Sequence, residues 1–325
     1  DPYVYDRWAQ DIAAGHWLGS EVFYGMPLYP YVLGLLYRLV GHRIAVAILI
    51  QLGCGVLSTV LIYLLATQLF NRAVGVLASL MALGYSLFMF YEGWLVSTSL
   101  EVFLYLLIAL ALVSVARAPS RNKWMGVGLL VGISALARAS VLLFLPVTAV
   151  WALWTKSDQR RRTRWVDVGG FLFAAFLMIL PVTVRNYVVA HDIVLITAHG
   201  GINFFLGNHP QADGTFKTPK EILAGAERLQ EEAARLAERH VGRPLRPSEV
   251  SAFWVSKGLE FARTEPLAFL RLLARKAALF LNGEEIADIM PYAFFARLVP
   301  LLQLPWLTFR VVCPLALLGM GLAWR

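Results

Sequence analysis

Charged residues are scarce in this sequence, since Asp, Glu, Lys and Arg make up only 15% of its 325 residues. A soluble globular domain has about a quarter of its residues charged, so the composition disfavours a soluble protein. Cys54 and Cys313 both lie inside apolar runs, which argues against a disulfide framework and a zinc site. The motifs GxxxxGK, HExxH, CxxC and GxSxG are absent, so nucleotide, zinc-protease and serine-hydrolase chemistry have no support.

Hydrophobic residues are abundant instead, at 58% of the chain. Apolar runs longer than about 18 residues recur, and the alternating pattern of barrel strands is absent. Because only helices or closed barrels satisfy the backbone in lipid, we predict an all-α polytopic membrane protein. The net charge of +8 is concentrated in short segments between the runs, which indicates membrane orientation and no nucleic-acid partner.

The positive-inside rule orders these runs across the membrane. The predicted spans are 43–70, 73–91, 95–116, 165–187 and about 301–324. The run 124–154 has a basic segment at each end, 117–123 and 156–164, and the rule places both ends in the cytoplasm. This run must therefore cross outward and return as two passes of about 15 residues, with Arg138 at the outer tip of the hairpin.

These spans divide the chain into four predicted parts. They are a first outer loop with an amphipathic helix (1–30), a transmembrane bundle (31–187), an outer, periplasmic loop with a helical cap (188–300) and a further transmembrane helix (301–325). The sequence opens within the first outer loop and without an initiator Met. We therefore expect a fragment that lacks the first span.

The outer segments show helical patterns of their own. Residues 1–17 have apolar side chains at helical spacing, and 27–41 form an apolar run too short to span. In the later segment, 199–208 (HGGINFFLGN) is predicted as a Gly/Asn-rich loop. Helices are predicted from Thr218 to about His240, from a cap at Ser248 to about Arg263, and over 267–282.

Ionisable residues within the apolar runs are the first candidates for chemistry. Glu101 lies inside a predicted span, where an ionisable group is costly and suggests function. Arg138 lies between two apolar half-spans, and its guanidinium suits a phosphate group. The alternatives are that Glu101 bonds to a neighbouring helix, and that Arg138 snorkels or pairs with Glu92 or Glu101.

Other candidates lie on the predicted outer surface. Asp1 and Asp6 are five residues apart, so they do not share a helix face, and solvated charges are the alternative interpretation. Gly200 and Gly201 would allow the backbone to approach a phosphate or sugar closely, unless they belong to an ordinary loop. Glu92 lies at the end of a predicted helix, and the alternative to a functional role is that it is a simple charged residue at the membrane interface.

Five features taken together carry a family resemblance. They are the Asp1, Tyr5 and Ala9 spacing, PLYPYVLGLLYRLVG at 27–41, FYEGWLVSTSLEVFL at 90–104, LARASVLLFLP at 136–146, and RNY at 185–187 with HGGINFFLGNHPQADG at 199–214. In these features the chain resembles the membrane glycosyltransferases of the GT-C superfamily, specifically the protein O-mannosyltransferase-like group (glycosyltransferase family 39). The resemblance covers most of the chain.

The resemblance implies a GT-C-type bundle that takes sugars from polyprenyl-phosphate-linked donors at the outer or lumenal face. It maps the catalytic acid onto Asp1. The chain departs from the pattern at Gly25 and Met26, where relatives often have Lys or Glu. It also has Thr98 where many relatives have an acid, so Glu92 or Glu101 would supply the second carboxylate.

The resulting hypothesis is an inverting glycosyltransferase. Asp1 and Glu92 are the predicted catalytic residues, and Arg138, Arg185 and His209 are predicted to bind the donor phosphate. The predicted substrate-binding residues are Tyr5, Asp6, Glu101, Gly200, Gly201, Asn203 and Asn208.

The hypothesis also predicts partners and a location. No cofactor is expected, and a divalent metal is not indicated because no cluster of acids is evident. The expected partners are the lipid-linked donor, an unknown acceptor and membrane lipid. The expected location is a bacterial inner membrane, with the active site facing the periplasm or exterior. The rival hypotheses are a lipid or solute transporter, although no repeated halves are visible, and a non-catalytic membrane scaffold.

Overall fold

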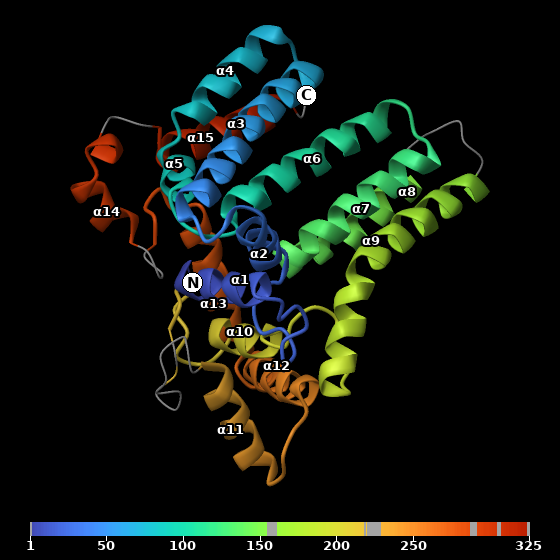
Figure 1. Cartoon of the computed structure of the whole chain (residues 1–325). Helices are drawn as coiled ribbons and strands as arrows, with labels where there is room; N and C mark the ends of the chain where they lie inside the picture. Colours follow the sequence, from blue (N-terminus) through green and yellow to red (C-terminus); the bar gives the residue numbers. More distant parts are fainter. Residues whose placement is uncertain are drawn as a thin grey trace. The chain divides into compact units, whose positions relative to one another are not determined.

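The structure is a computed structural model that describes residues 2–154, 161–217, 219, 229–286, 291–303 and 307–323. The regular elements of the described residues are helices (Figure 1). The helices α3 (Ile44–Leu69), α6 (Thr98–Arg117) and α9 (Arg161–Ala190) are long and apolar enough to cross a membrane. This confirms the all-α polytopic membrane fold and three of the predicted spans.

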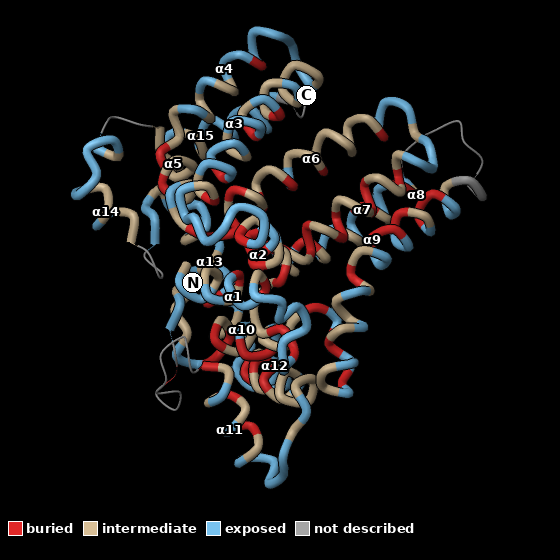
Figure 2. Tube along the Cα trace, viewed as in Figure 1, coloured by how far each residue is buried: buried red, intermediate tan, exposed pale blue. Residues whose placement is uncertain are grey.

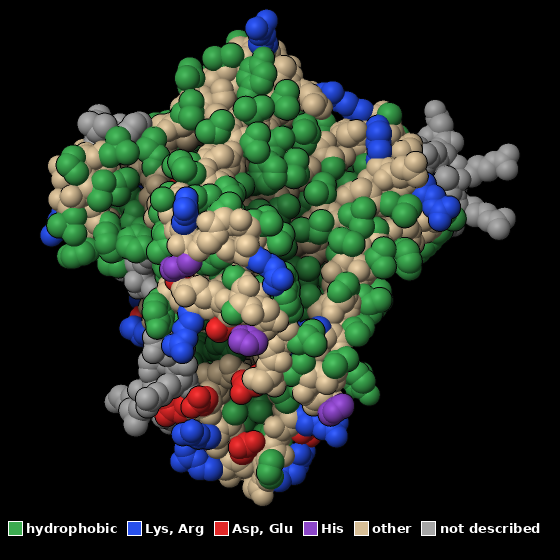
Figure 3. All heavy atoms as spheres, viewed as in Figure 1, with side chains coloured by type: hydrophobic (Ala, Val, Ile, Leu, Met, Phe, Trp, Pro, Cys, Tyr) green, Lys and Arg blue, Asp and Glu red, His purple; other side chains and the backbone are tan. Residues whose placement is uncertain are grey.

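The surface of these helices suits lipid. Large apolar side chains of α3, among them Leu49, Val56 and Leu57, are half exposed or more. Figure 3 shows hydrophobic side chains covering α3, α4 (Arg72–Leu83) and α6, whereas charged side chains gather over α11 (Leu229–Val241) and α12 (Pro247–Thr264). A helix that is apolar on its exposed face is stable only where that face meets other apolar material, here acyl chains.

The predicted continuous span 73–91 is wrong. The chain forms α4, breaks at Gly84 and Tyr85, and continues as α5 (Ser86–Glu92). Tyr85 has an extended backbone, which interrupts the helical hydrogen bonds. The apolar composition on both sides of the break concealed it from the sequence pattern.

The predicted hairpin around Arg138 is confirmed. The helix α7 (Arg121–Ala137) ends where Arg138 becomes extended, and a short 3-10 turn, η1 (Ala139–Leu143), leads into α8 (Phe144–Trp154). The ring of Trp124, at the start of α7, lies 5.7 Å from that of Trp151, near the end of α8. The two helices therefore run in opposite directions.

The first helix, α1 (Pro2–Ala13), packs closely on α2 (Leu28–Val40). Ala9 and Ile12 are fully buried in this contact. A Cβ added at Gly34 would lie 2.8 Å from the Cβ of Ile12, so only glycine allows this approach. The predicted amphipathic helix and the short apolar helix are both present, and they form one packed pair.

The chain divides into two compact units. The first comprises Asp1–Ser20 and Met26–Arg185, and the second comprises Glu21–Gly25 and Asn186–Arg325. The fully buried Asn186 organises the start of the second unit. Its amide donates to the carbonyls of Val194 and Ile196 at 3.0 and 2.9 Å, and its oxygen accepts from the Phe23 amide at 3.3 Å.

The rest of the second unit is helical. It contains α10 (Gly200–Gly207), α11, α12, α13 (Pro266–Phe280), α14 (Tyr292–Leu298), the 3-10 turn η3 (Pro300–Gln303) and α15 (Phe309–Ala323). A core of Ile202, Leu206, Leu229, Ala233 and Trp254 joins α10, α11 and α12. Figure 2 shows buried residues on α10 and α12, whereas α14 has none.

Four predictions for this unit need correction or qualification. The segment 199–208 is not a loop, because its apolar residues form the buried face of α10. Ser248 does not cap α12: Arg246 is the N-cap, and the Ser248 hydroxyl donates to Asp192 at 2.7 Å. Residues 218 and 220–228 of the first predicted helix lie outside the described residues, whereas α13 confirms the third helix. The last predicted span is shorter, since its helix begins at Phe309.

Candidate functional site

The ion pair between Arg138 and Glu101 is the centre of the candidate site. Arg138 lies where α7 ends, and Glu101 lies in the first turn of α6. The guanidinium Nε donates to Oε2 of Glu101 at 2.6 Å, and the Ser97 hydroxyl donates to Oε1 at 2.5 Å. The Glu101 side chain is 6% exposed and that of Arg138 is 59% exposed. The carboxylate is therefore enclosed, while the cation retains access from outside.

Tyr5 of α1 completes this cluster. Its hydroxyl is hydrogen-bonded to Ser97, and it lies within the electrostatic reach of Glu101 and Arg138. Burial, followed by the charge of Glu101, raises the pKa of Tyr5. The Tyr5 ring also meets Tyr29 of α2 edge to face, with 5.3 Å between centroids. The cluster thus holds the first turn of α1 against α6.

Asp6, the next residue of α1, makes a second set of contacts. Its carboxylate accepts hydrogen bonds from Tyr37 at 2.5 Å and Gln10 at 2.7 Å, and it pairs with His42 at 3.0 Å. Burial opposes ionisation, but the hydrogen bonds from Tyr37 and His42 outweigh it and lower the pKa of Asp6. The structure thus gives Asp6 a local anchoring contact, and its part in substrate binding stays a prediction.

The structure describes only one of the two predicted catalytic acids, Glu92. Asp1 lies outside the described residues, directly before α1. Glu92 faces Ser99 and Val102 of α6 in a small cavity. Ser99 and Glu101 differ by two positions, or about 200° around a helix, so Glu92 and Arg138 lie against opposite faces of α6. The structure therefore does not bring Glu92 into the Arg138 cluster.

Arg185 belongs to the same unit but makes a different contact. Its terminal nitrogen donates to the carbonyl of Leu18, in the turn that follows α1. A Cβ at Gly19 would lie 2.9 Å from that nitrogen, so this glycine leaves room for the guanidinium. The predicted donor-binding role of Arg185 stays a prediction.

The remaining candidates lie in the second unit. Gly201 is buried, and a Cβ there would lie 2.0 Å from the Ser251 carbonyl, so it serves helix packing between α10 and α12. Asn208 donates to the Phe204 carbonyl at 2.7 Å and accepts from Lys276 at 2.9 Å. The imidazole of the buried His209 accepts from the Gln211 amide at 3.2 Å. Gly200 and Asn203 are exposed.

Arg138 belongs to the first unit, whereas these candidates belong to the second. The single phosphate site that would combine His209 with Arg138 therefore stays a prediction. Among the described residues, no three His, Cys, Asp or Glu side chains group together as they would around a metal. The expectation that the reaction uses no metal stays a prediction.

Sequence analysis missed two organising residues. Ser97 is hydrogen-bonded to both Glu101 and Tyr5. It lies four residues before Glu101, and this spacing is the sequence feature from which its contact with Glu101 could have been predicted. Gln51 accepts from the Tyr29 hydroxyl and donates to the carbonyls of Glu92 at 3.0 Å and Trp94 at 2.7 Å. A lone glutamine in an apolar helix indicates an interhelical hydrogen bond.

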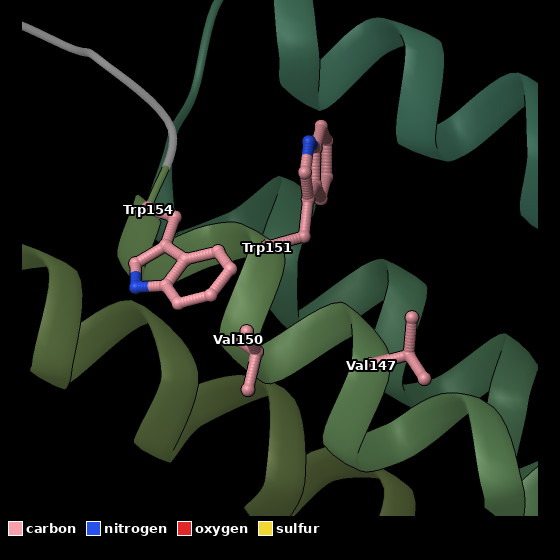
Figure 4. A pocket seen from close by; sticks show the side chains of 4 residues that line it. All are labelled: Val147, Val150, Trp151 and Trp154. Atoms are coloured by element: carbon pink, nitrogen blue, oxygen red, sulfur yellow. The ribbon is translucent and has the colours of Figure 1, made fainter.

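An apolar groove of about 460 Å³ lies apart from these residues, on α8. Figure 4 shows its lining side chains, Val147, Val150, Trp151 and Trp154, projecting from successive turns of that helix. Their i, i+3, i+4 and i+7 spacing makes one apolar stripe. The only polar side-chain groups of its lining residues are the indole N–H groups of Trp151 and Trp154, and its largely apolar character suits contact with lipid.

The apolar spans make the chain an integral membrane protein, and its helices surround an enclosed carboxylate with an accessible guanidinium. Residues 25–184 match the model of the dolichyl-phosphate-mannose-protein mannosyltransferase family. The match confirms the predicted resemblance for this part of the chain, which contains Glu92, Glu101 and Arg138, and it points to a glycosyltransferase of the GT-C kind. No curated protein and no solved structure matches the chain.

Proposed function

We propose that the protein transfers a sugar from a polyprenyl-phosphate-linked donor to an acceptor hydroxyl at the outer face of the membrane, with inversion. The family name, which includes a dolichyl-phosphate-linked sugar, supports a lipid-phosphate donor. The observation that carries the proposal is the ion pair of Arg138 and Glu101. It provides an oriented cation at the break between two apolar helices.

The geometry of Arg138 suits a phosphate. Glu101 engages Nε, so the terminal nitrogens of the guanidinium lie outside that bond. These nitrogens form the planar fork that binds two phosphate oxygens together. Glu101 is itself held by Ser97, so the guanidinium is oriented before the donor arrives. An oriented cation stabilises the charge that develops on the leaving phosphate.

The chemical step is a substitution at the anomeric carbon. Asp1 accepts the proton of the acceptor hydroxyl, whose oxygen forms the new bond to that carbon. The bond from the anomeric carbon to the phosphate oxygen breaks, and its electron pair leaves with the lipid phosphate beside Arg138. Asp1 is joined covalently to the first turn of α1, whose Tyr5 contacts the ion-pair cluster.

The orientation of the protein follows from charge. The basic segments 117–123 and 156–164 flank the α7–α8 hairpin, and the positive-inside rule favours the cytoplasm for both. Arg138, between the two helices, then faces outward. We accordingly propose a bacterial inner membrane with the reaction at the periplasmic or exterior face.

Donor binding by purified variants tests the proposal. We expect Arg138→Ala to weaken binding of a polyprenyl-phosphate sugar by about 10-fold to 100-fold, the value of one or two charge-assisted hydrogen bonds. Arg138→Lys should recover part of the affinity, because lysine keeps the charge but not the fork. Arg72→Ala, an exposed arginine at the start of α4, is the matched control. Equal donor affinity in the Arg138→Ala and Arg72→Ala variants would contradict the assignment.

A further inference from the structure

The helix α13 has a broad apolar face that is exposed. Leu267 and Leu270 are 69% and 58% exposed, and Phe280 in the last turn is 79% exposed. Ala274 and Ala277 continue the line of Leu267 and Leu270 at helical spacing, and both are exposed as well. The 15 residues of α13 give a length of about 22 Å, which is shorter than the hydrocarbon core of about 30 Å. The helix is therefore apolar on its exposed side but too short to cross a membrane.

The opposite side of α13 is fixed to the second unit. Leu272 is buried, and the Phe269 ring meets that of Phe261 in α12 with 6.0 Å between centroids. Lys276 donates a hydrogen bond to the side-chain oxygen of Asn208 at 2.9 Å. These contacts determine which side of α13 faces outward, so the exposed apolar face belongs to the folded unit.

Arg271 and Arg275 form a basic row along one edge of this apolar face. They are four residues apart, and Arg271 follows Leu267 by the same spacing, so the three positions are neighbours along one side of the helix. Both arginines are exposed, and neither makes a hydrogen bond or an ion pair with another described residue. The helix itself contains no Asp or Glu. Because a guanidinium binds two phosphate oxygens through paired donors, the row suits phosphate groups that carry negative charge.

We propose that α13 lies in the interface of the bilayer and binds anionic phospholipid there. Its apolar face enters the boundary between headgroups and acyl chains, and Arg271 and Arg275 meet the phosphates at its edge. Interfacial helices bind through buried apolar area together with electrostatic attraction to anionic lipids. The second unit begins within the membrane-spanning helix α9, so the chain enters this unit directly from the bilayer. This lipid binding does not depend on the proposed sugar transfer.

An interfacial α13 would also fix the depth of the segment that it holds. Lys276 holds Asn208, and His209 is the next residue. Both are predicted to bind the substrate or the donor phosphate. The helix would keep them at the level of the headgroups, where the phosphate of a lipid-linked donor lies. This consequence, unlike the lipid binding itself, rests on the proposed function.

A fluorescent label on α13 tests where the helix lies. With Cys54 and Cys313 replaced by alanine, Leu270→Cys is labelled with bimane in the full chain. The protein is placed in nanodiscs of equal parts phosphatidylcholine and phosphatidylglycerol. Brominated acyl chains should quench this label, whereas aqueous iodide should not. Arg239→Cys, an exposed position on α11, is the control and should be quenched by iodide.

Two results with this label would overturn the proposal. Quenching of the Leu270→Cys label by iodide would place the face of α13 in water. Protection from both iodide and brominated chains would show that protein covers the face, either another part of this chain or a second copy.

Paired variants test the dependence on anionic lipid. The affinity of detergent-solubilised protein for short-chain phosphatidylglycerol is measured beside phosphatidylcholine of the same chain length, which should bind more weakly. One arginine near an anionic surface is worth about 5-fold in affinity, so Arg271→Gln combined with Arg275→Gln should weaken binding of phosphatidylglycerol by roughly 25-fold. Arg235→Gln combined with Arg239→Gln removes two charges at the same spacing from α11 and should leave the affinity unchanged.

Three results of this comparison would also overturn the proposal. They are equal affinity of the wild type for the two phospholipids, equal affinity of the two double variants for phosphatidylglycerol, and tighter binding of polyprenyl phosphate than of phosphatidylglycerol. The last result would assign the two arginines to the lipid-linked donor.

Discussion

The Tyr37 hydroxyl donates a 2.5 Å hydrogen bond to the Asp6 carboxylate and so joins α1 to α2. Tyr5, the residue before Asp6, contacts Ser97, and the two side chains leave α1 about 100° apart. A helix held by two such contacts has a fixed orientation, and the residue that precedes it, Asp1, is the proposed base. The predictions below test the parts of this arrangement separately.

Asp6 should stabilise the protein in a pH-dependent way. Its pKa is lowered in the folded state, so its contribution is present above the unfolded value of about 3.9 and is lost as pH falls through the folded value. Asp6→Asn should therefore lower the unfolding midpoint at neutral pH and flatten the loss of stability in acid. The exposed Asp11, on the same helix, provides the control Asp11→Asn. Identical acid profiles for the two variants would remove the anchoring role from Asp6.

Gly34→Ala should separate α1 from α2. The added Cβ would meet Ile12 at 2.8 Å and the Ala9 carbonyl at 2.9 Å, and overpacking of this kind costs about 1–3 kcal/mol. Gly126→Ala is the matched control, since a Cβ there meets no atom within 4 Å. Limited proteolysis within α1 should become faster in Gly34→Ala alone. Unchanged cleavage would show that α1 is not held through this contact.

Glu101 and Arg138 should be energetically coupled. Removing either partner leaves the other unpaired, whereas removing both has a smaller effect than the sum. A double-mutant cycle with Glu101→Gln and Arg138→Gln should give a coupling free energy of about 1–3 kcal/mol in thermal or denaturant unfolding. Additive effects within about 0.5 kcal/mol would mean that the ion pair does not hold the site together.

Chemical labelling tests how the α7–α8 hairpin is oriented across the membrane. With Cys54 and Cys313 replaced by alanine, Ser140→Cys should react with an impermeant maleimide added outside intact cells, because Ser140 follows Arg138 at the proposed outer tip. Asn122→Cys, at the start of α7, should react only after the membrane is opened. The reverse pattern would place Arg138 on the cytoplasmic side and contradict the proposed reaction at the outer face.

The sequence predicted the fold more fully than the site. Basic residues on both flanks of 124–154 required a return pass, and the chain does reverse at Arg138. The break at Gly84 and Tyr85 gave no such signal, because apolar residues continue through it. The sequence allowed Arg138 to pair with either Glu92 or Glu101. The pair forms with Glu101, because the orientation of α6 about its own axis turns Glu101 toward Arg138, and the sequence pattern does not give that orientation. Gly201 was interpreted as part of a ligand-binding loop. Its actual packing partner, Ser251, is 50 residues away in the sequence, so the sequence pattern gave no sign of that contact.

Single-turnover sugar transfer by Asp1→Asn tests the central claim most directly. The variant should bind the polyprenyl-phosphate donor as the wild type does, since Arg138 and Glu101 are intact, yet lose transfer by about 100-fold or more, as expected for a general base. Asp11→Asn, measured beside it, should transfer normally. Wild-type transfer by Asp1→Asn would contradict the account, because the acceptor would then be activated without the residue that α1 is proposed to position.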